Sequence, residues 1–400
     1  MYTIIPLREQ QIQISPETEA AVFRVERDLI RLDEKFKFGM FSQSLKAALK
    51  RIEAVSAVGI GGKRAPLAPL LWAEALADIG KARGNAGYLQ SLSELHGQRI
   101  SSEEAVAIYE TLCFENALEW LADALESNAS ITTETVRTIH QLCKTGAATS
   151  CCEGFSTNAR RGGFGTYRPP APQVVPGLVQ DVCDFVNKSL YGPITQASIM
   201  HFQFEGILPF DDMSDRVGLA LSHAILLKRG VVGKRLFVPF SWAGYVSREQ
   251  RKRFQSPYLE PSFLEDPNVN AAINRWSVYN ARNTQVSVRL VNVFLDSMTK
   301  LEREWRGLLG KVTQQSALDS LVELFLGMPL LTASRAAAII GKSFSATNDA
   351  LARLETEGII VKHDVNLKER VFVAESSFNL TCNLFEQLMS KRGNVKPAKA

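Results

Sequence analysis

Apolar positions repeat at intervals of three and four residues through most of the chain, which is the spacing of helices that bury one face. The repeat is clear over residues 70–125, where leucine, isoleucine and valine recur on one side. It returns further along, and the helices expected there cover residues 175–190, 194–204, 214–229 and 271–309. The pattern therefore predicts a mainly α protein whose central part is a large helical core.

Two segments break the helical pattern. Residues 59–66, Gly-Ile-Gly-Gly-Lys-Arg-Ala-Pro, follow a helical stretch over 17–51 and have the glycine and proline content of a loop or linker. Residues 152–172 are rich in Gly, Ser, Arg and Pro, which predicts an ordered loop or short hairpin. We therefore separate an N-terminal helical segment and linker, residues 1–69, from the helical core, residues 70–310.

Shorter elements follow residue 313. The pattern predicts one helix over 316–326, a second helix that Thr332 caps, and a third helix that Ser345 caps and Gly358 ends. Serine and threonine suit the N-cap position because their hydroxyls accept hydrogen bonds from the free backbone N–H groups at a helix start. The three helices predict a helix-turn-helix unit.

A hairpin completes this C-terminal unit. Two runs of β-branched or aromatic residues, 359–361 and 371–373, flank a polar stretch. The order of helix, helix-turn-helix and hairpin is that of a winged helix, which we place at residues 314–376. A C-terminal helix and basic tail cover residues 377–400. The predicted fold is therefore mainly α, with a helical core and a C-terminal winged helix-turn-helix.

Composition and charge narrow the functional classes. The chain has 400 residues and 46% hydrophobic composition, which is enough for one large core or two to three smaller ones. Its 46 Lys and Arg against 42 Asp and Glu give a formal charge of +4, so any nucleic-acid contact must come from a local patch. The six cysteines lack metal-ligand spacing. Because no stretch approaches the roughly 18 apolar residues of a membrane span and no signal peptide is evident, we expect a cytoplasmic protein without membrane contact.

One stretch, residues 199–230, carries a pattern of another kind. A helix ending in Phe204-Glu205-Gly206-Ile207 leads to a Pro-Phe turn, a polar loop and a second helix. It resembles the signature of the Fic (Fido) family, H-P-F-x-D/E-G-N-G-R-x-x-R, which a helix ending in F-E-x-I commonly precedes. The resemblance spans roughly residues 70–306, and many family members also carry a winged helix. It implies a Fic-type helical core.

The resemblance also implies a chemistry. In active family members the histidine is a general base for a target hydroxyl, the Gly-Asn-Gly loop holds the phosphates of ATP at a helix N-terminus, and the acidic residue helps to hold Mg²⁺. ATP and Mg²⁺ are therefore the cofactors that the resemblance suggests. Many members also carry an inhibitory helix with a glutamate, and the nearest segment here, residues 75–81, lacks it.

Position by position, the motif is only partly kept. Leu208 replaces the histidine, and a leucine cannot accept a proton, which removes a contribution of about 10²–10⁴-fold. Met213 and Asp215 replace the two glycines, Ser214 replaces the asparagine and Leu219 replaces the last arginine. The candidate site is therefore the degenerate motif Leu208, Pro209, Phe210, Asp212, Ser214 and Arg216, with Arg216 and Ser214 as nucleotide ligands and Asp212 as a magnesium ligand.

Each of these residues also has a structural interpretation. Pro209 and Phe210 can start a helix and fill a core. Arg216 can contact a phosphate or be the buried partner of Glu205 or Asp212. Acidic residues in a first helical turn are favoured by the helix dipole without any cation. The same choice between site and structure applies to Asp211, Asp215, His201 and His223.

In a winged helix, the third helix enters the major groove of DNA. Acidic residues lie between the candidate bases, so non-specific affinity should be limited and dependent on salt. Winged helices also serve as protein-contact domains, and both roles stay open. The candidate DNA contacts are Lys342, Ser343, Ser345, Thr347, Asn348 and Arg353 on the helix, with Lys362, Lys368 and Arg370 on the hairpin.

Two functions therefore remain. In the first, a degenerate Fic-fold protein without adenylyl transfer is a DNA-binding or ligand-sensing regulator, with the apolar helix 271–309 as a candidate homodimer interface. In the second, an enzyme with a non-standard site still transfers AMP, or another nucleotidyl or phosphoryl group, from Mg-ATP held by Arg216 and Asp212. The joint loss of the base and both glycines favours the first function.

Overall fold

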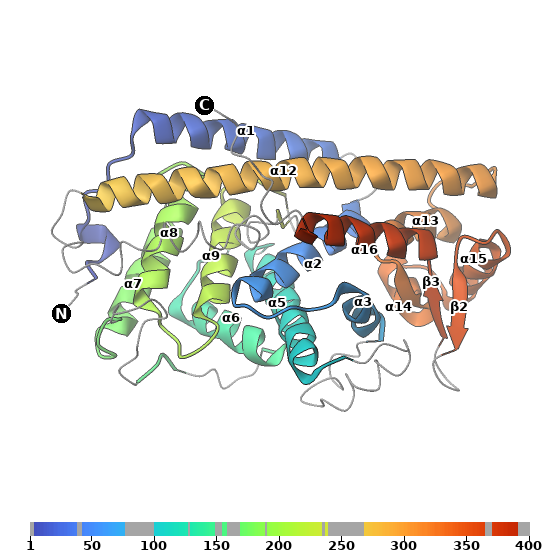
Figure 1. Cartoon of the computed structure of the whole chain (residues 1–400), viewed down its shortest axis with the longest axis horizontal. Helices are drawn as coiled ribbons and strands as arrows, with labels where there is room; N and C mark the ends of the chain where they lie inside the picture. The colour runs from blue at the N-terminus through green and yellow to red at the C-terminus, as the bar shows by residue number, and fades with distance from the viewer. Residues whose placement is uncertain are drawn as a thin grey trace.

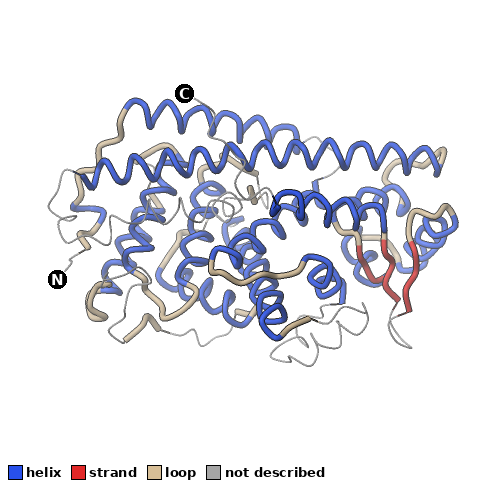
Figure 2. The backbone as a smooth tube through the Cα atoms, in the orientation of Figure 1, coloured by secondary structure: helices blue, strands red, loops and turns tan. Residues whose placement is uncertain are grey.

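The structure is a computed structural model of the chain. It describes residues 4–37, 42–76, 100–126, 129–148, 154–157, 169–188, 190–233, 237–238, 268–364 and 370–390. The described part is mainly helical, as the apolar pattern predicts (Figure 1, Figure 2).

The helices of the first three quarters of the chain follow a short 3₁₀ turn, η1 (Leu7–Glu9). They are α1 (Pro16–Lys37), α2 (Ser42–Ile60), α3 (Leu67–Leu76), α5 (Ser102–Glu126), α6 (Thr133–Thr145), α7 (Val175–Val186), α8 (Pro193–Ile207), α9 (Ser214–Lys228) and α12 (Asn268–Leu309). The last four, α7, α8, α9 and α12, lie within a few residues of the expected ranges.

The single helical stretch expected over 17–51 is wrong, because α1 and α2 are separate helices. They bury their apolar faces against different neighbours: α1 packs on α12, whereas α2 packs on α5 and on α13 (Ala317–Gly327). One straight helix could not reach both partners. The inhibitory-helix segment, residues 75–81, lies outside the described residues from residue 77 onward.

The long helix α12 joins two hydrophobic clusters. At 42 residues it is about 63 Å long, and in Figure 1 it runs along the whole molecule with α1 beside it. Trp276 near its start is buried with α5 to α9, whereas Phe294 and Trp305 are buried with α1, α2, α3 and the C-terminal elements. The helix therefore ties the motif region to the C-terminal end of the fold.

The C-terminal elements form a small unit at one end of the molecule (Figure 1). After α13 come β1 (Leu330–Thr332), α14 (Ala333–Ile340), α15 (Phe344–Thr356), β2 (Val361–Asp364), β3 (Arg370–Val373) and α16 (Glu375–Ser390). The strands form an antiparallel sheet in the order β1-β3-β2, with Leu331 opposite Phe372 and His363 opposite Val371. We refer to α13 through β3 as the C-terminal module.

Three details of the C-terminal module differ from the sequence prediction. Ser343, and not Ser345, caps α15, because the Ser343 hydroxyl accepts a hydrogen bond from the backbone N–H of Ala346 at 3.2 Å. The strand predicted at residues 359–361 begins only at Val361, where pairing with β3 starts. Ile359 and Ile360 are buried but lie before the strand. The strand β1 was not predicted, because three residues are too few for a periodic signal.

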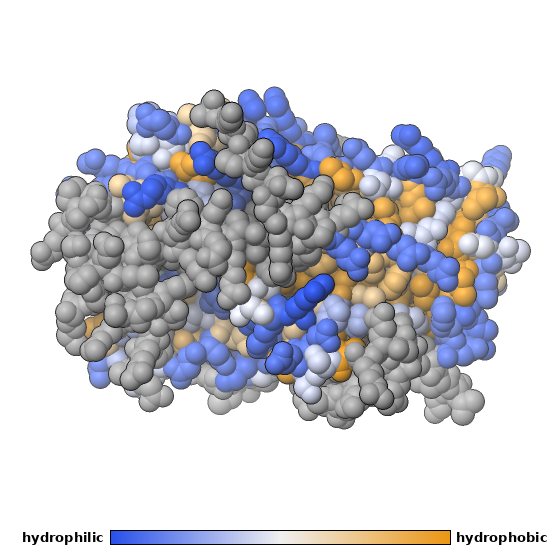
Figure 3. Space-filling model, in the orientation of Figure 1, coloured by the Kyte–Doolittle hydropathy of each residue, from blue (hydrophilic) through white to orange (hydrophobic). Residues whose placement is uncertain are grey.

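The C-terminal module is seated on α2 and α3. Arg51 pairs with both carboxylate oxygens of Glu74, at 2.6 and 2.7 Å, and its Nη1 donates to the carbonyl of Gly327 at 3.2 Å. A Cβ added at Gly327 would lie 2.0 Å from the carbonyl oxygen of Ser44, so the two backbones touch. On the face drawn in Figure 3, apolar side chains gather over this end of the molecule. Among the described helices, none is both long and apolar enough to cross a membrane.

Candidate active site

The motif loop joins α8 to α9, and a left-handed residue stands at each of its ends. Leu208 (φ 48°, ψ 62°) ends α8, and its N–H donates to the carbonyl of Phe204 at 3.0 Å. Met213 (φ 57°, ψ 8°) precedes α9. This conformation costs a residue with a Cβ about 1–2 kcal/mol, so the surrounding packing must hold it. Both side chains are half-buried against the cluster around α5 to α9.

Ser214 closes the loop on itself. Its hydroxyl accepts from the N–H of Phe210 and donates to the carbonyl of Phe210, both at 3.1 Å. The side chain is buried, and its single proton is already used. In this arrangement the Ser214 hydroxyl stabilises the turn and has no proton left to donate to a phosphate.

Arg216 points into the protein, where it meets a residue that the sequence did not suggest. Its Nη2 lies 2.8 Å from Glu110 Oε2, and both side chains are buried. Lys63 contacts the other carboxylate oxygen of Glu110, and Nη1 contacts the sulfur of Met213. The prediction that Arg216 pairs with Glu205 or Asp212 is therefore wrong. Glu110 stands on α5, 106 residues away, and its only sequence signal is a charge among the apolar positions of that helix.

Asp212 is held by a histidine that the sequence also left unmarked. His140 of α6 places its Nε2 2.9 Å from Asp212 Oδ1, and Lys144 lies 3.9 Å from the other oxygen. The His140 ring stacks on Phe210, with centroids 3.9 Å apart and planes within 2°. His140 is 2% exposed, and its Nδ1 has no hydrogen-bond partner among the described residues. The Asp212 side chain is 46% exposed, so a cation could reach it.

Asp211, the carboxylate before Asp212 in the loop, is also engaged. Asp211 accepts a hydrogen bond from the hydroxyl of Ser156, whose N–H donates to the carbonyl of Pro209 at 2.9 Å. Within the described residues, no group of three or more His, Cys, Asp or Glu side chains is placed to hold a metal ion. The protein groups around Asp212 could thus supply part of a magnesium shell, with a bound phosphate supplying the rest.

The two histidines of the motif helices are core residues. His201 lies 3.3 Å from Glu205 one turn along α8, and its ring packs on Trp276. His223 lies 2.8 Å from Glu53 of α2, and both side chains are at most 1% exposed. Each histidine therefore joins α8 or α9 to its neighbours.

The candidate DNA contacts divide into three groups. Lys342, Ser345 and Asn348 lie at the solvent-accessible start of α15, and Lys362 and Arg370 lie on the two paired strands. The remaining four either form hydrogen bonds within the protein or lie outside the described residues; they are Ser343, Thr347, Arg353 and Lys368.

Thr347 corrects the prediction. It is fully buried, and its hydroxyl donates to the carbonyl of Ser343 at 2.9 Å, so it cannot reach a base. Ser343 caps the helix, and Arg353 Nη2 donates to the carbonyl of Leu309 at the end of α12 at 2.9 Å. Lys368 lies outside the described residues.

Comparisons with known proteins identify a Fic/DOC family domain in the chain. Residues 130–226, from just before α6 to within α9, match the model of the Fic/DOC family. A protein of Aquifex aeolicus named "Probable protein adenylyltransferase" is 36% identical over 67 residues, which are 16% of this chain and 21% of that protein. The chain thus spans about a fifth of the length of this curated relative.

Two solved structures are similar over more of the chain. A Fic family protein from Desulfovibrio desulfuricans is 16% identical, with a TM-score of 0.46, over 90% of this chain and 97% of that one. A Fic domain containing signaling protein from Bacteroides thetaiotaomicron is 13% identical, with a TM-score of 0.44, over 68% of this chain and 96% of that one.

Proposed function

We propose that the Fic/DOC family domain at residues 130–226 no longer transfers adenylyl groups, and that the protein is a regulator acting through a C-terminal winged helix. The observation that carries the proposal is that the motif side chains contact other parts of the protein instead of facing a ligand. Leu208 stands in the place of the base, and Arg216 is buried in an ion pair with Glu110.

The first support is that no histidine among the described residues is placed to act as a base for a target hydroxyl at the motif. The half-buried side chain of Leu208 has no atom that accepts a proton. His140 is close, but it is 2% exposed and its Nε2 is directed at Asp212. A general base must come within hydrogen-bond reach of the target hydroxyl. His140 could do so only after α6 or the loop moved.

The second support is the state of the phosphate-binding positions. The Ser214 hydroxyl is committed to Phe210, and Arg216 would have to leave Glu110 to meet a phosphate. When Arg216 leaves, Glu110 keeps Lys63 as its partner, so the cost is below the about 3–5 kcal/mol of a buried charge left with no partner at all. ATP would have to supply that free energy before any transfer.

A second function, nucleotidyl or phosphoryl transfer from Mg-ATP, keeps one specific observation in its favour. His140 and Asp212 form a close pair at the edge of the motif, and the acidic partner is half exposed. The relative of Aquifex aeolicus carries the name of an adenylyltransferase. In this alternative, Asp212 holds magnesium and Arg216 swings from Glu110 to the nucleotide.

Incubation with α-labelled ATP and Mg²⁺ separates the two functions. We expect no label on the protein itself or on added lysate proteins, for the wild type and for Arg216→Ala alike. A matched Arg27→Ala variant, which changes an exposed arginine on α1, controls for general loss of charge. Protein-bound label that Arg216→Ala abolishes and Arg27→Ala keeps would establish transfer and end the pseudoenzyme proposal.

The regulatory part rests on the start of α15. Lys342 directly precedes the capping residue of α15, and Ser345 and the half-buried Asn348 lie in the first turn and a half of the helix. Basic side chains also lie on β2 and β3. A helix of this kind reads base edges with its early polar residues. The exposed Phe344 beside Lys342 suits a protein partner better than DNA, so the protein-contact alternative also has a marker.

Selection from random duplex DNA at low salt tests this part. We expect an enriched consensus, with dyad symmetry if the protein is a homodimer. Lys342→Glu should weaken binding to it by about tenfold or more, because a phosphate contact is lost and a repulsive charge is added. Lys311→Glu, on the loop before α13, should change affinity little. If no sequence is enriched, the DNA-binding proposal fails. Binding of a protein partner that is lost in Phe344→Ala would then support the protein-contact role instead.

A further inference from the structure

A surface pocket of about 600 Å³ opens beside the motif. This volume lies within the range of roughly 300–1,000 Å³ that is common for small-molecule sites. The pocket is bounded by the start of α6, the start of α7 and residues 154–157, and its lining contains none of residues 208–216. The walls include Thr133, Arg137, Phe155, Ser156, Pro176 and Gln180.

Three positive sources face this pocket. Thr133 is the first residue of α6 and Pro176 the second residue of α7, so the positive ends of two helices of 13 and 12 residues meet here. The residue before α7, Val174, provides no side-chain cap. The third source is Arg137, whose Nε is buried and has no hydrogen-bond partner among the described residues.

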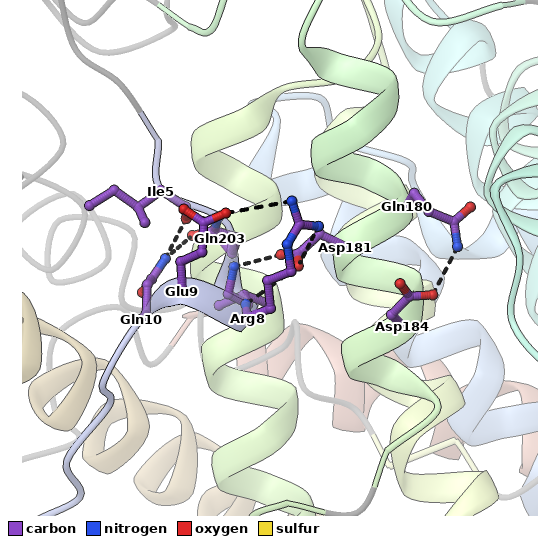
Figure 4. Close-up of polar contacts among 9 residues, drawn as sticks. Ile5, Arg8, Glu9, Gln10, Gln180, Asp181, Asp184 and Gln203 are labelled. Atoms are coloured by element: carbon purple, nitrogen blue, oxygen red, sulfur yellow. Dashed lines mark hydrogen bonds and ion pairs between the residues drawn. The ribbon is translucent and has the colours of Figure 1, made fainter.

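The nearby carboxylates offset only part of this charge. Glu134 pairs with Arg137 Nη2 at 2.9 Å, but its side chain is 63% exposed, so solvent and salt screen it. Asp211 is not among the residues that line the pocket, and it accepts a hydrogen bond from the Ser156 hydroxyl. Asp184 accepts from the Gln180 amide at 2.8 Å, one turn further along α7 (Figure 4). An anionic group therefore fits the mouth of the pocket.

The remaining walls suit a flat apolar group. The Arg137 guanidinium stands over the Phe155 ring at 5.7 Å, and Pro172 and Pro176 add apolar surface. Aromatic faces and guanidinium planes both stack on planar rings. We propose that this pocket binds a small molecule in which a phosphate or carboxylate is joined to a planar ring.

The pocket is connected to the motif loop through two neighbouring residues. The Ser156 N–H and hydroxyl hold Pro209 and Asp211, and the Phe155 ring packs against Phe210 with centroids 5.5 Å apart. A ligand stacked on Phe155 thus fixes residues 154–157 against the loop. The site goes beyond the proposed regulatory function, and its ligand binding does not depend on that function.

Gly177 offers a variant that blocks the anion without disturbing the fold. It is the third residue of α7, between the lining residues Pro176 and Gln180, and an added Cβ would meet no atom within 4 Å. An aspartate at this position is favoured by the helix dipole. Gly177 does not itself line the pocket but directly follows Pro176, which does, so Gly177→Asp keeps α7 and places a negative charge next to the pocket; Gly177→Ala is its matched control.

The probe is phenyl phosphate, measured by ligand-observed NMR titration at low salt. Phenol carries only the ring and inorganic phosphate only the anion, and we expect both to bind at least tenfold more weakly. Gly177→Asp and Arg137→Gln should each weaken phenyl phosphate at least tenfold, and Gly177→Ala should stay within about twofold. Thermal unfolding of each variant, measured without ligand, checks that the fold is kept.

Two results would overturn the proposal. One is equal binding of phenyl phosphate to the wild type and to Gly177→Asp, including no binding to either. The other is loss of binding on Arg216→Ala but not on Gly177→Asp, which would move the anion to the motif helix. Neither result depends on ATP labelling or on DNA selection, so a failure here is distinct from a failure of the proposed function.

Discussion

The backbone at Met213 keeps a conformation that its side chain does not favour. The family signature has glycine at this position, and the φ of 57° is one that glycine adopts without cost. Leu208, at the other end of the loop, is left-handed as well. Packing against the helical cluster and the contact between Met213 and Arg216 therefore maintain the turn.

The strain at Met213 can be measured by comparing two substitutions. Met213→Gly and Met213→Ala both remove the long side chain, but only glycine removes the Cβ. We expect the glycine variant to be more stable than the alanine variant by about 0.5–1 kcal/mol, because relief of the left-handed strain exceeds the extra chain entropy of glycine. Urea unfolding of the two variants checks this. An alanine variant of equal or higher stability would show that the turn is unstrained.

At the scale of elements, the N-terminal segment is fastened to the helices of the family domain. Asp181 of α7 accepts from the N–H of Leu7 at 2.5 Å and from the backbone and guanidinium of Arg8, both at 3.4 Å (Figure 4). Gln203 of α8 donates to the carbonyl of Ile5 at 2.9 Å. These contacts hold η1 against α7 and Ile5 against α8, at separations of 174 and 198 residues in sequence. The segment is thus part of the fold that supports the motif.

Loss of Asp181 should loosen this attachment. Asp181→Ala leaves the Leu7 N–H without its acceptor in a buried place, and we expect a loss of about 1–3 kcal/mol of stability. Asp184→Ala, three residues along the same helix, removes an exposed carboxylate and should cost within about 0.5 kcal/mol. Thermal and urea unfolding report the difference. Equal stability of the two variants would mean that the segment contributes nothing to the core.

At the scale of the whole molecule, α5 links the motif to the C-terminal module. Glu110 faces Arg216, and five residues later Glu115 lies among charges from α2, α3 and α14. Burial raises the pKa of Glu115 to about 8, and Glu74 adds to this, whereas Lys50, Arg51 and Arg335 oppose it. The protonated carboxyl therefore fits this junction better than the carboxylate.

Stability should consequently fall as the pH rises. The folded pKa of Glu115 is above its ordinary value of 4.5, so its contribution is fully present below about pH 4.5 and is lost as the pH approaches 8. The free energy of unfolding should decline by up to about 1.4 kcal/mol for each pH unit in this window. Glu115→Gln should flatten that slope, and Glu103→Gln, exposed on the same helix, should not. Identical slopes for all three proteins would contradict this account.

The sequence by itself determined the helical core, most helix positions and the altered motif. These features depend on local information: a period of three to four, capping residues such as Thr332, and residue types whose chemistry is fixed wherever they lie. A leucine at position 208 cannot accept a proton in any fold. The strand pair after α15 was also predicted, because β-branched runs carry a local signal.

Only the tertiary structure decided what the polar residues contact. Glu110 and His140 became partners of Arg216 and Asp212 through helix packing across 106 and 72 residues, which no spacing rule connects. Thr347 was expected at the surface because it is polar, but it is buried. The buried side of α15, which packs on α13, includes this polar residue, so hydrophobicity alone could not identify it. A side chain's type is local, whereas its burial and its partner depend on which elements meet, and that depends on the packing of the whole chain.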